Sequence, residues 1–268
     1  MDRRALQALD SVAASATVSP VDELVEGWRC KAAPDLPFRR CNVVLAPVGI
    51  GDDPEVVQRG LDAVQRWCAD RGQRLIVQVS DADPTSSALD RHLAAAGLSI
   101  EAPVDVMVAP IGAVRAIDAR DRRHPTAEVE IGIDEAWAAS AAVVEASSDV
   151  DRVRALAYGR MLAELGPRAM GATVEDAGRA AGLGFGVVDG PWLGIFGMRT
   201  APNHRRRGVA SAIVTALCHQ AAAAGATDAY LQVEVDNDAA IACYRRLGFV
   251  RSHGYHYRSN HVDPEQGC

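Results

Sequence analysis

The sequence predicts an α/β fold in which a central mixed, mostly antiparallel sheet is flanked by helices. Strands and amphipathic helices alternate through the second half of the chain, and the first half repeats the closing part of that order more weakly. With 268 residues, 49% of them apolar, the chain is long enough to build two modest cores. We therefore expect two tandem domains, residues 1–115 and 126–262.

The second half begins with one strand-like run and two helical runs, at residues 126–133, 134–148 and 149–165. Three further strand-like runs follow, at residues 169–175, 180–190 and 192–202. Turn signals separate these three runs at 176–178 and 189–191, which predicts an antiparallel meander. The chain then gives a helix, a strand, a second helix and a last strand, at residues 209–225, 229–235, 239–248 and 249–257.

The first half gives a strand, helix, strand, helix and strand, at residues 41–49, 54–70, 74–80, 87–98 and 104–111. This order predicts an internal duplication that sets Pro47 against Pro202, Gly97 against Gly248 and Leu93 against Tyr244. Residues 112–125 are polar and charged without an apolar period, so a linker is expected there. The first thirty residues give no assignment.

Composition excludes several classes of protein. No apolar run reaches the length of a membrane span and the first residues do not resemble a secretory signal, so we expect a cytoplasmic protein without membrane partners. A formal charge of -7 disfavours nucleic acid as a partner. The six cysteines form no C-x-x-C pair, and His253 and His256 fall on opposite faces of a strand, so no metal site is expected.

One segment has the pattern of an anion site. After the strand at 192–202 the chain runs through Arg205, Arg206 and Arg207 to Gly208 and then becomes a helix. The first N–H groups of a helix lack internal partners, and the helix dipole adds positive potential there. The guanidinium groups add to this attraction. A solvated basic face would show the same arginines, but the position between strand and helix favours a pyrophosphate site.

Two spaced motifs then resemble the GNAT superfamily of acyl-CoA-dependent N-acyltransferases. The first is P-x-x-R-x-x-G-x-A and the second is N-x-x-A-x-x-x-Y-x-x-x-G-F, about thirty residues later. Their residues here are Pro202, Arg205, Gly208, Ala210, Asn237, Ala240, Tyr244, Gly248 and Phe249. The resemblance covers residues 126–257 and is weaker before Leu193, where only the order of elements agrees. It implies a GNAT fold and acetyl-CoA as cosubstrate.

The resemblance also implies residue roles. The backbone amides of Arg206, Arg207, Gly208, Val209 and Ala210 would hold the pyrophosphate of acetyl-CoA. The strand edge at Met198, Arg199 and Thr200 would pair with the pantetheine amides. Asn237 would lie along the same arm or cap its helix. Tyr244 would protonate the departing thiolate, because a phenol has a pKa of about 10 against about 8.5 for a thiol. Packing is the alternative role of its ring.

No residue stands out as the general base that the amine needs. The strand before the loop holds no carboxylate, which leaves Glu234 on the following strand, Glu175 at the hairpin, or a water relay. Glu234 shares a strand face with Gln232 and Tyr230, although a solvated carboxylate on a strand is the more common situation.

The first half lacks both motifs. Asp52 and Asp53 stand near where the second half has arginines, and Ser86 and Leu93 align with Asn237 and Tyr244. We therefore expect a degenerate GNAT-like domain that does not bind cofactor.

The function that follows is transfer of an acetyl group from acetyl-CoA to a primary amine of a small molecule or peptide by direct attack. The rival is a non-catalytic acyl-CoA-binding sensor module. A structural partner without a cofactor would require both motifs to be accidental. The acceptor is not specified by the sequence, and a homodimer is left open.

Overall fold

The computed structural model describes residues 1–118, 125–145 and 149–260. Residues 119–124 of the expected linker, residues 146–148 of an expected helix and Cys268 lie outside this part of the chain. Contacts divide the chain into two compact units, Met1–Asp105 with His253–Cys268, and Val106–Ser252. This division differs from the expected ranges 1–115 and 126–262, because the last strand contributes most of its residues to the first unit.

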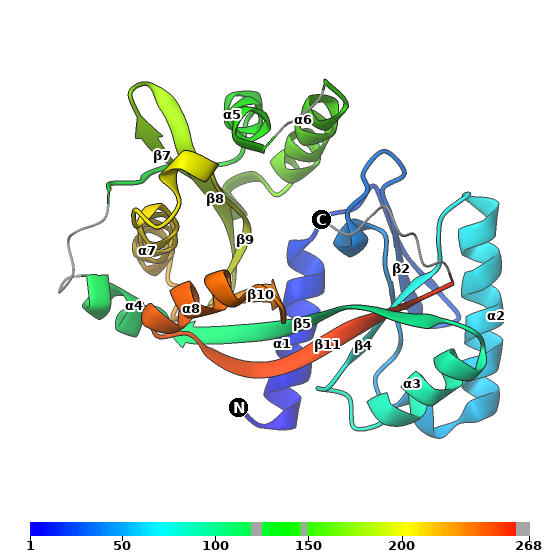
Figure 1. Cartoon of the computed structure of the whole chain (residues 1–268). Helices are drawn as coiled ribbons and strands as arrows, with labels where there is room; N and C mark the ends of the chain where they lie inside the picture. The colour runs from blue at the N-terminus through cyan, green and yellow to red at the C-terminus, as the bar shows by residue number, and fades with distance from the viewer. Residues whose placement is uncertain (119–124, 146–148, 261–268) are drawn as a thin grey trace. The chain divides into compact units, whose positions relative to one another are not determined.

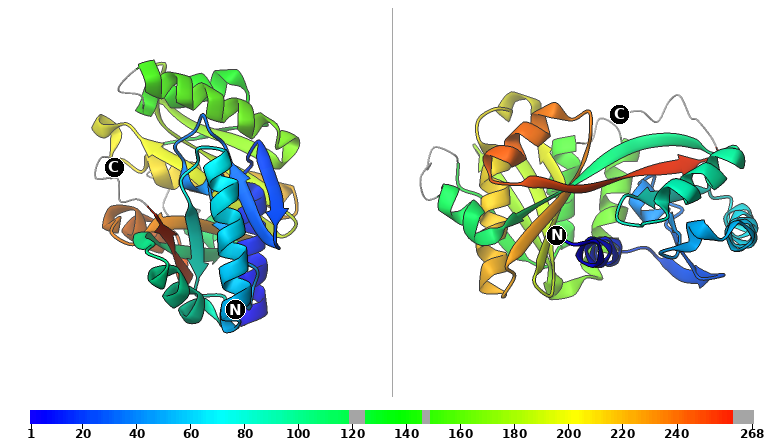
Figure 2. Two further views of the ribbon diagram at one scale, coloured as in Figure 1. Left: turned by 90° about the vertical axis from the view of Figure 1, so that its right-hand side faces the viewer. Right: turned by 90° about the horizontal axis from the view of Figure 1, so that it is seen from below.

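The first unit is a sheet between helices. Its helices are α1 (Arg3–Ala16), α2 (Pro54–Asp70) and α3 (Ser86–Ala95). Its strands are β1 (Val21–Val25), β2 (Trp28–Ala32), β3 (Val44–Leu45), β4 (Ile76–Ser80) and parts of β5 (Ser99–Pro110) and β11 (Val250–Ser259). They lie in the order β1-β2-β3-β4-β11-β5, with β3 and β4 parallel. Figures 1 and 2 show α1 and α2 on opposite sides of β1 to β3.

The second unit contains the expected meander. Its helices are α4 (Ile111–Asp118), α5 (Glu135–Glu145), α6 (Asp149–Ala163), α7 (Val209–Ala223) and α8 (Asp238–Arg246). Its strands are β6 (Glu128–Ile131), β7 (Ala169–Asp176), β8 (Arg179–Asp189), β9 (Trp192–Thr200) and β10 (Asp228–Glu234). The order β5-β10-β9-β8-β7-β6 is antiparallel from β9 to β6, while β9 and β10 run parallel. A mixed sheet flanked by helices is thus confirmed.

The two hairpin turns of the meander form where the sequence predicts them. Ala177 and Gly178 have φ values of 50° and 73°, and Gly190 has a φ of 55°. Glycine adopts this left-handed conformation without steric cost, which is why it is common in tight turns. Residues of β7 and β8 then pack with α7 and form the core of this unit, which includes Met170, Ala172 and Leu217.

The expected linker is wrong over its first part, because residues 111–118 form helix α4. Ile111 and Val114 are buried, at 2% and 0% exposure, and α4 packs against α7. The Ile111 N–H donates to the Thr227 carbonyl at 2.9 Å, and the Arg115 Nε donates to His219 Nδ1 at 3.1 Å. Two apolar residues three positions apart are enough to bury one face of this short helix.

The expected strand at 41–49 is also shorter than predicted. Only Val44 and Leu45 are strand, and Ile50–Asp52 form a 3-10 turn. The first thirty residues, left unassigned from the sequence, form α1, β1 and most of β2. Among the helices of the described residues, none combines the length and the hydrophobicity that a membrane span needs.

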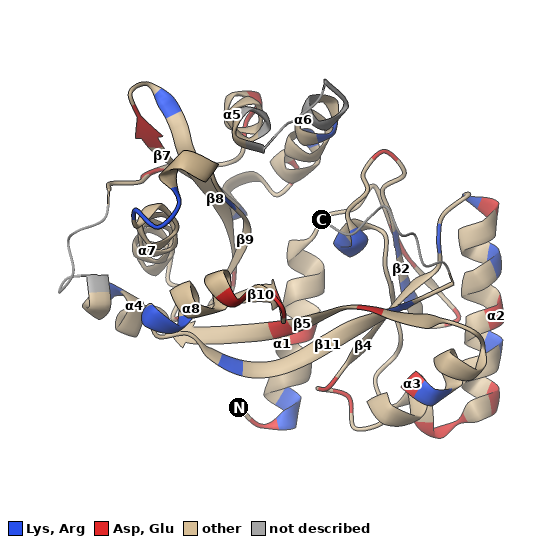
Figure 3. Cartoon of the chain, in the orientation of Figure 1, with Lys and Arg blue, Asp and Glu red and all other residues tan. Residues whose placement is uncertain are grey.

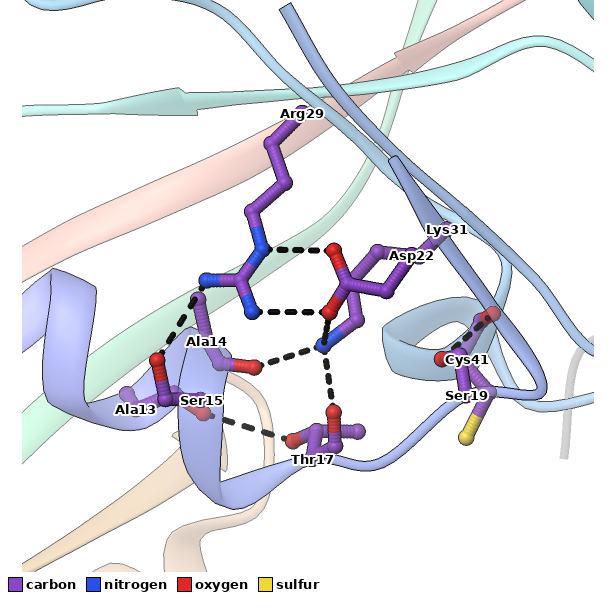
Figure 4. Close-up of polar contacts among 9 residues, drawn as sticks. All are labelled: Ala13, Ala14, Ser15, Thr17, Ser19, Asp22, Arg29, Lys31 and Cys41. Atoms are coloured by element: carbon purple, nitrogen blue, oxygen red, sulfur yellow. Dashed lines mark hydrogen bonds and ion pairs between the residues drawn. The ribbon is translucent and has the colours of Figure 1, made fainter. Parts of the chain in front are cut away.

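A buried lysine fixes the end of α1 in the first unit (Figure 4). Lys31 is 1% exposed, and its ammonium donates to the carbonyls of Ala14, at 2.6 Å, and Thr17. Asp22 lies 3.6 Å from the same ammonium and accepts two hydrogen bonds of 2.7 Å from Arg29. Burial lowers the pKa of Lys31 despite this carboxylate. A cation at carbonyls that lack helical partners stabilises a helix end.

The last helix of each half ends alike. Gly97 and Gly248 follow α3 and α8 with φ values of 85° and 89°. The residue after each glycine donates back into the helix, from Leu98 to the Leu93 carbonyl at 3.1 Å and from Phe249 to the Tyr244 carbonyl at 3.0 Å. These caps match the predicted alignment of the two halves.

Candidate active site

The site begins where β9 and β10 part. Their parallel pairing runs from Asp228 opposite Trp192 to Leu231 opposite Ile195, and both strands continue beyond it, to Glu234 and Thr200. The carboxyl ends of parallel strands lie at the same edge of a sheet, where ligands of α/β folds bind. This edge therefore brings together the strand end with Met198, Arg199 and Thr200, the turn that leads into α7, and Glu234.

A bulge bends β9 at this point. Phe185 pairs with Phe196 and Leu183 pairs with Arg199, so Gly197 and Met198 stand opposite the single residue Gly184. Gly197 has a φ of 59°. A Cβ on Gly184 would come within 2.4 Å of the Met198 sulfur, so the absence of a side chain there makes room for Met198. A bulge re-aims backbone groups away from the regular ladder.

The arginine loop has the backbone of an anion site. Arg206 and Gly208 adopt left-handed φ values of 60° and 82° in the turn before α7, and no side chain caps the start of this helix. Left-handed residues in a turn make successive N–H groups converge. Arg205, Arg206 and Arg207 are exposed, and none pairs with a carboxylate of the described residues. Figure 3 shows these basic residues beside α7.

Glycines on β8 place this helix start against the sheet. A Cβ on Gly182 would lie 2.5 Å from Cγ1 of Val209 and 2.7 Å from the Arg199 carbonyl oxygen. Without that atom, the first residue of α7 packs directly over β8, next to the strand end that carries Met198. The predicted loop and the predicted strand edge are therefore neighbours.

In the corresponding loop of the first unit, side chains of the same unit already accept hydrogen bonds from the backbone N–H groups. The carboxylate of Asp53 accepts from the N–H groups of Glu55 and Val56, both at 3.1 Å, and so caps α2. Asp83 accepts from the Gly49 N–H at 3.0 Å, and the Thr85 hydroxyl accepts from the Gly51 N–H at 3.1 Å. Backbone donors bound in this way are not available to a phosphate.

This unit also holds a cavity of about 280 Å³ close to the same loop. Its lining includes Asp10, Asp83, Pro47, Gln78 and Ser80. The one arginine among its described lining residues, Arg29, is paired with Asp22 at 2.7 Å, so the cavity carries two carboxylates and no unpaired arginine for a phosphate. Its chemistry differs from that of the α7 loop.

Asn237 caps α8, as one of its two expected roles requires. Its Oδ1 accepts from the Ala240 N–H at 3.1 Å. This cap does not test whether Asn237 also lies along the cofactor arm.

Tyr244 lies on α8 and is 8% exposed, with its ring centroid 6.1 Å from that of Phe249. The ring therefore packs in the core. Its neighbour Cys243 has its sulfur 3.6 Å from the Ser211 hydroxyl in the first turn of α7. This contact holds α8 beside the helix that follows the arginine loop. The acid role of Tyr244 stays a prediction.

The carboxylates offered as bases are exposed. Glu234 ends β10 and Glu175 lies near the end of β7, and the side chains of both reach solvent. Glu234 stands at the same sheet edge as the loop, whereas Glu175 is on the β7–β8 hairpin. The assignment of either residue as the base stays a prediction.

His204, which immediately precedes the arginines, was not among the site residues predicted from the sequence. Its Nε2 lies 2.9 Å from Oδ2 of Asp176, and its Nδ1 lies 2.9 Å from Oδ1 of Asn203. Its side chain is 17% exposed. Its position next to the arginines was the only feature of the sequence that could have indicated a role, because its partner Asp176 precedes it by 28 residues.

Four cysteines of the described residues are buried, and these residues hold no candidate metal site. The thiols of Cys30, Cys41, Cys68 and Cys218 are buried. Burial raises the pKa to about 12 for Cys30 and Cys218, and to about 11 for Cys41 and Cys68. They are neutral thiols without nucleophilic character near pH 7. Within the same residues, no group of three His, Cys, Asp or Glu side chains could hold a metal ion.

His253 and His256 contact different carboxylates. Nε2 of His253 lies 2.8 Å from Asp10, and Nε2 of His256 lies 2.7 Å from Asp90. Both histidines belong to the first unit, whereas the arginine loop belongs to the second.

Comparison with known proteins supports the observed fold. A GCN5-related N-acetyltransferase from Kribbella flavida has a similar fold, with a TM-score of 0.66 and 16% identity over 91% of each chain. A tandem GNAT protein from the clavulanic acid biosynthesis pathway superposes with a TM-score of 0.59 and 13% identity, over 82% of this chain and 76% of that chain. At these identities the likeness concerns the fold.

A shorter sequence match links the chain to the N-alpha-acetyltransferase MAK3 of Arabidopsis thaliana. The two are 41% identical over 61 residues, which make up 22% of this chain and 32% of that protein. The match thus spans about a third of the length of this curated relative.

The family described as probable histone acetyltransferase Rv0428c C-terminal matches residues 4–258. This range is nearly the whole chain and includes both units. The expected GNAT fold is confirmed by the solved structures. The chain belongs to the Rv0428c C-terminal acetyltransferase family, within the GNAT superfamily of acyltransferases.

Proposed function

We propose that this chain moves an acetyl group from acetyl-CoA to a primary amine of a small molecule or peptide by direct attack. The observation that carries the proposal is the start of α7. There the helix has no side-chain cap, Arg206 and Gly208 are left-handed, and three exposed arginines stand at the edge where β9 and β10 part. A pyrophosphate needs this combination of convergent N–H donors and nearby cations.

The residues at this edge fit a bound acyl-CoA along its length. The N–H groups of Arg206, Arg207, Gly208, Val209 and Ala210 would hold the pyrophosphate. The end of β9 at Met198, Arg199 and Thr200 lies beyond its pairing with β10. It would pair with the amides of the pantetheine arm as an added strand does. Asn237 keeps its cap and would border the same arm.

The bound thioester supplies an activated acyl group, and the residues of this chain position the partners and move two protons. Glu234, at the solvent-exposed end of β10, would take the proton that the amine releases. Tyr244 on α8 would donate a proton to the departing sulfur. Backbone N–H groups at the bulge of β9 would polarise the carbonyl. Holding both substrates together contributes much of the rate enhancement.

The first unit is proposed to be a GNAT-like domain that binds no acyl-CoA, in a tandem arrangement. The support is its loop, where Asp53, Asp83 and Thr85 already bond the backbone N–H groups. Titration of the full-length protein with acetyl-CoA should give one site per chain. Two sites per chain would contradict this part of the proposal.

The names of the relatives suggest which amines to test. The family description refers to a histone acetyltransferase, and MAK3 is an N-alpha-acetyltransferase. Peptides with a free α-amine and peptides with an internal lysine therefore belong in the panel beside small amines. A cytoplasmic location stays a prediction.

The test is release of free CoA thiol from acetyl-CoA in the presence of each amine, with calorimetric titration of acetyl-CoA alongside. Saturable binding together with amine-dependent release supports the transferase. Binding without release by any amine favours the sensor module. Absence of binding would overturn both.

A further inference from the structure

The histidine next to the arginine loop connects that loop to a separate hairpin of the same unit. His204 ends the 3-10 turn Pro202–His204, directly before Arg205. Asp176 ends β7, at the β7–β8 hairpin. The contact of 2.9 Å between His204 Nε2 and Asp176 Oδ2 therefore holds the loop from outside its own segment.

Both ring nitrogens of His204 face oxygen atoms. Asp176 offers a carboxylate, which only accepts hydrogen bonds, and Asn203 turns its Oδ1 toward Nδ1 at 2.9 Å. A neutral imidazole has one donor and one acceptor, whereas an imidazolium has two donors. The contact with the Asp176 carboxylate requires a hydrogen on Nε2, which both the neutral Nε2–H ring and the imidazolium carry, and the imidazolium makes the stronger, charge-assisted bond.

The surrounding charges are of both signs. Asp176 and Glu175 are carboxylates on the hairpin, and Arg179 faces Asp176 from the start of β8. Arg205, Arg206 and Arg207 follow His204 on its own loop. The direct partner of the ring is the carboxylate, so the protonated form gains a charge-assisted hydrogen bond. That bond weakens when the ring loses its proton.

The His204–Asp176 contact matters for the loop because the arginine side chains of the loop make no contact, in the part of the chain that the structure describes, that would fix its conformation. Arg205 to Arg207 are exposed without carboxylate partners among the described residues, and no side chain caps α7. The backbone bonds of this turn run from His204 to the Ala201 carbonyl at 2.8 Å and from Arg205 to the Pro202 carbonyl at 3.4 Å. The side chain of His204 adds a bond to a different strand.

We propose that His204, bridged to Asp176, is a positioning residue that holds the arginine loop in its anion-binding shape and makes acyl-CoA affinity depend on pH. This inference rests on the proposed function, because it concerns the same loop. The affinity should fall as pH rises through the neutral range, where histidine side chains lose their charge. Histidine is suited to such a role, since its ordinary pKa of about 6.5 lies near neutrality.

The experiment is calorimetric titration of full-length protein with CoA at pH values from about 5.5 to 8.5, a range that brackets the ordinary histidine pKa. The wild type is compared with His204→Gln, which keeps an N–H donor toward Asp176 but carries no charge at any pH. The phosphates of CoA also titrate in this range, so the quantity of interest is the ratio of the two dissociation constants. His219→Gln, on the far part of α7, is the control for loss of a histidine.

At low pH the wild type should bind about tenfold more tightly than His204→Gln, as expected for exchanging a charge-assisted hydrogen bond for a neutral one. At high pH the ratio should approach one. His219→Gln should follow the wild type throughout. A constant ratio across the range would overturn the role of His204 while leaving the proposed function intact. Failure of the wild type to bind CoA at any pH would overturn both.

A second measurement does not depend on the ligand. NMR of the His204 ring nitrogens should show a hydrogen-bonded Nε2–H in the wild type and a weaker bond in Asp176→Asn, because a neutral amide oxygen is a poorer acceptor than a carboxylate. Identical ring nitrogen shifts in the two proteins would show that the pair does not form in solution and would also overturn the inference.

Discussion

Replacing Gly208 with glutamate places a carboxylate at the start of α7, where the pyrophosphate is proposed to bind. A charge about 5 Å from a phosphate, at an effective dielectric constant of about 20, costs roughly 3 kcal/mol. This corresponds to a loss of affinity for CoA of about two orders of magnitude. The φ of 82° at Gly208 adds a separate cost of about 1 to 2 kcal/mol for any residue with a Cβ, paid in the stability of the loop.

Gly208→Gln is the matched control, because it has the same size and the same backbone strain without the charge. The two variants should lose similar amounts of unfolding free energy in urea titrations, and they should differ about a hundredfold in the dissociation constant for CoA. The difference should shrink at 1 M salt, where the Debye length is about 3 Å. Equal affinities of Gly208→Glu and Gly208→Gln would refute the placement of the pyrophosphate at this loop.

Two further predictions concern α8, and a third concerns the pair of Asp90 on α3 with Arg258 on β11. Tyr244→Phe should lower kcat by about a hundredfold with little change in CoA affinity, as measured by thiol release and calorimetry; unchanged kcat would leave the ring with a packing role alone. Asn237→Ala should destabilise the protein by about 1 kcal/mol, because it removes the cap on Ala240 N–H, and Asn237→Asp should restore it; equal stability of both in urea would contradict the cap. Asp90 accepts two bonds of 2.7 Å from Arg258, which lower its pKa below 3.8. The stability that the Asp90 carboxylate contributes is therefore fully present above its unfolded pKa and is lost as pH falls through its folded pKa. Thermal unfolding of Asp90→Asn from pH 5 to 2 should show a smaller loss of stability with falling pH than the wild type shows. An equal loss in both proteins would count against the pair.

Much of the second unit could be predicted from local patterns. The Asp-Ala-Gly and Asp-Gly-Pro turns predicted the meander β7-β8-β9, and the apolar period after Gly208 predicted α7. The same holds for α2, whose residues 54–70 were predicted without error at either end. Turn conformations, caps and helical periods depend on residues within a few positions of one another, so a single sequence carries them.

Helix α4 formed where the sequence predicted a linker. Its charged residues indicated a linker, yet Ile111 and Val114 bury against α7. These two apolar residues stabilise a helix only because α7, about a hundred residues later in the sequence, provides the surface against which they pack. The missed α1 and β1 show the same dependence, since Lys31 and Asp22 hold them through contacts that follow no period.

The sequence alone therefore determined the fold class, the meander and the arginine loop, since turns, caps and amphipathic periods are local properties of the chain. Only the tertiary structure decided that β11 pairs with β4, from Tyr255 opposite Ser80 to Ser259 opposite Ile76, and so moved the division between units. It likewise decided that His204 contacts Asp176 and that backbone N–H groups of the corresponding loop in the first unit, such as that of Gly49, are already hydrogen-bonded. These contacts join residues distant in sequence, and their partners are selected by packing and hydrogen-bond geometry, which no local pattern encodes.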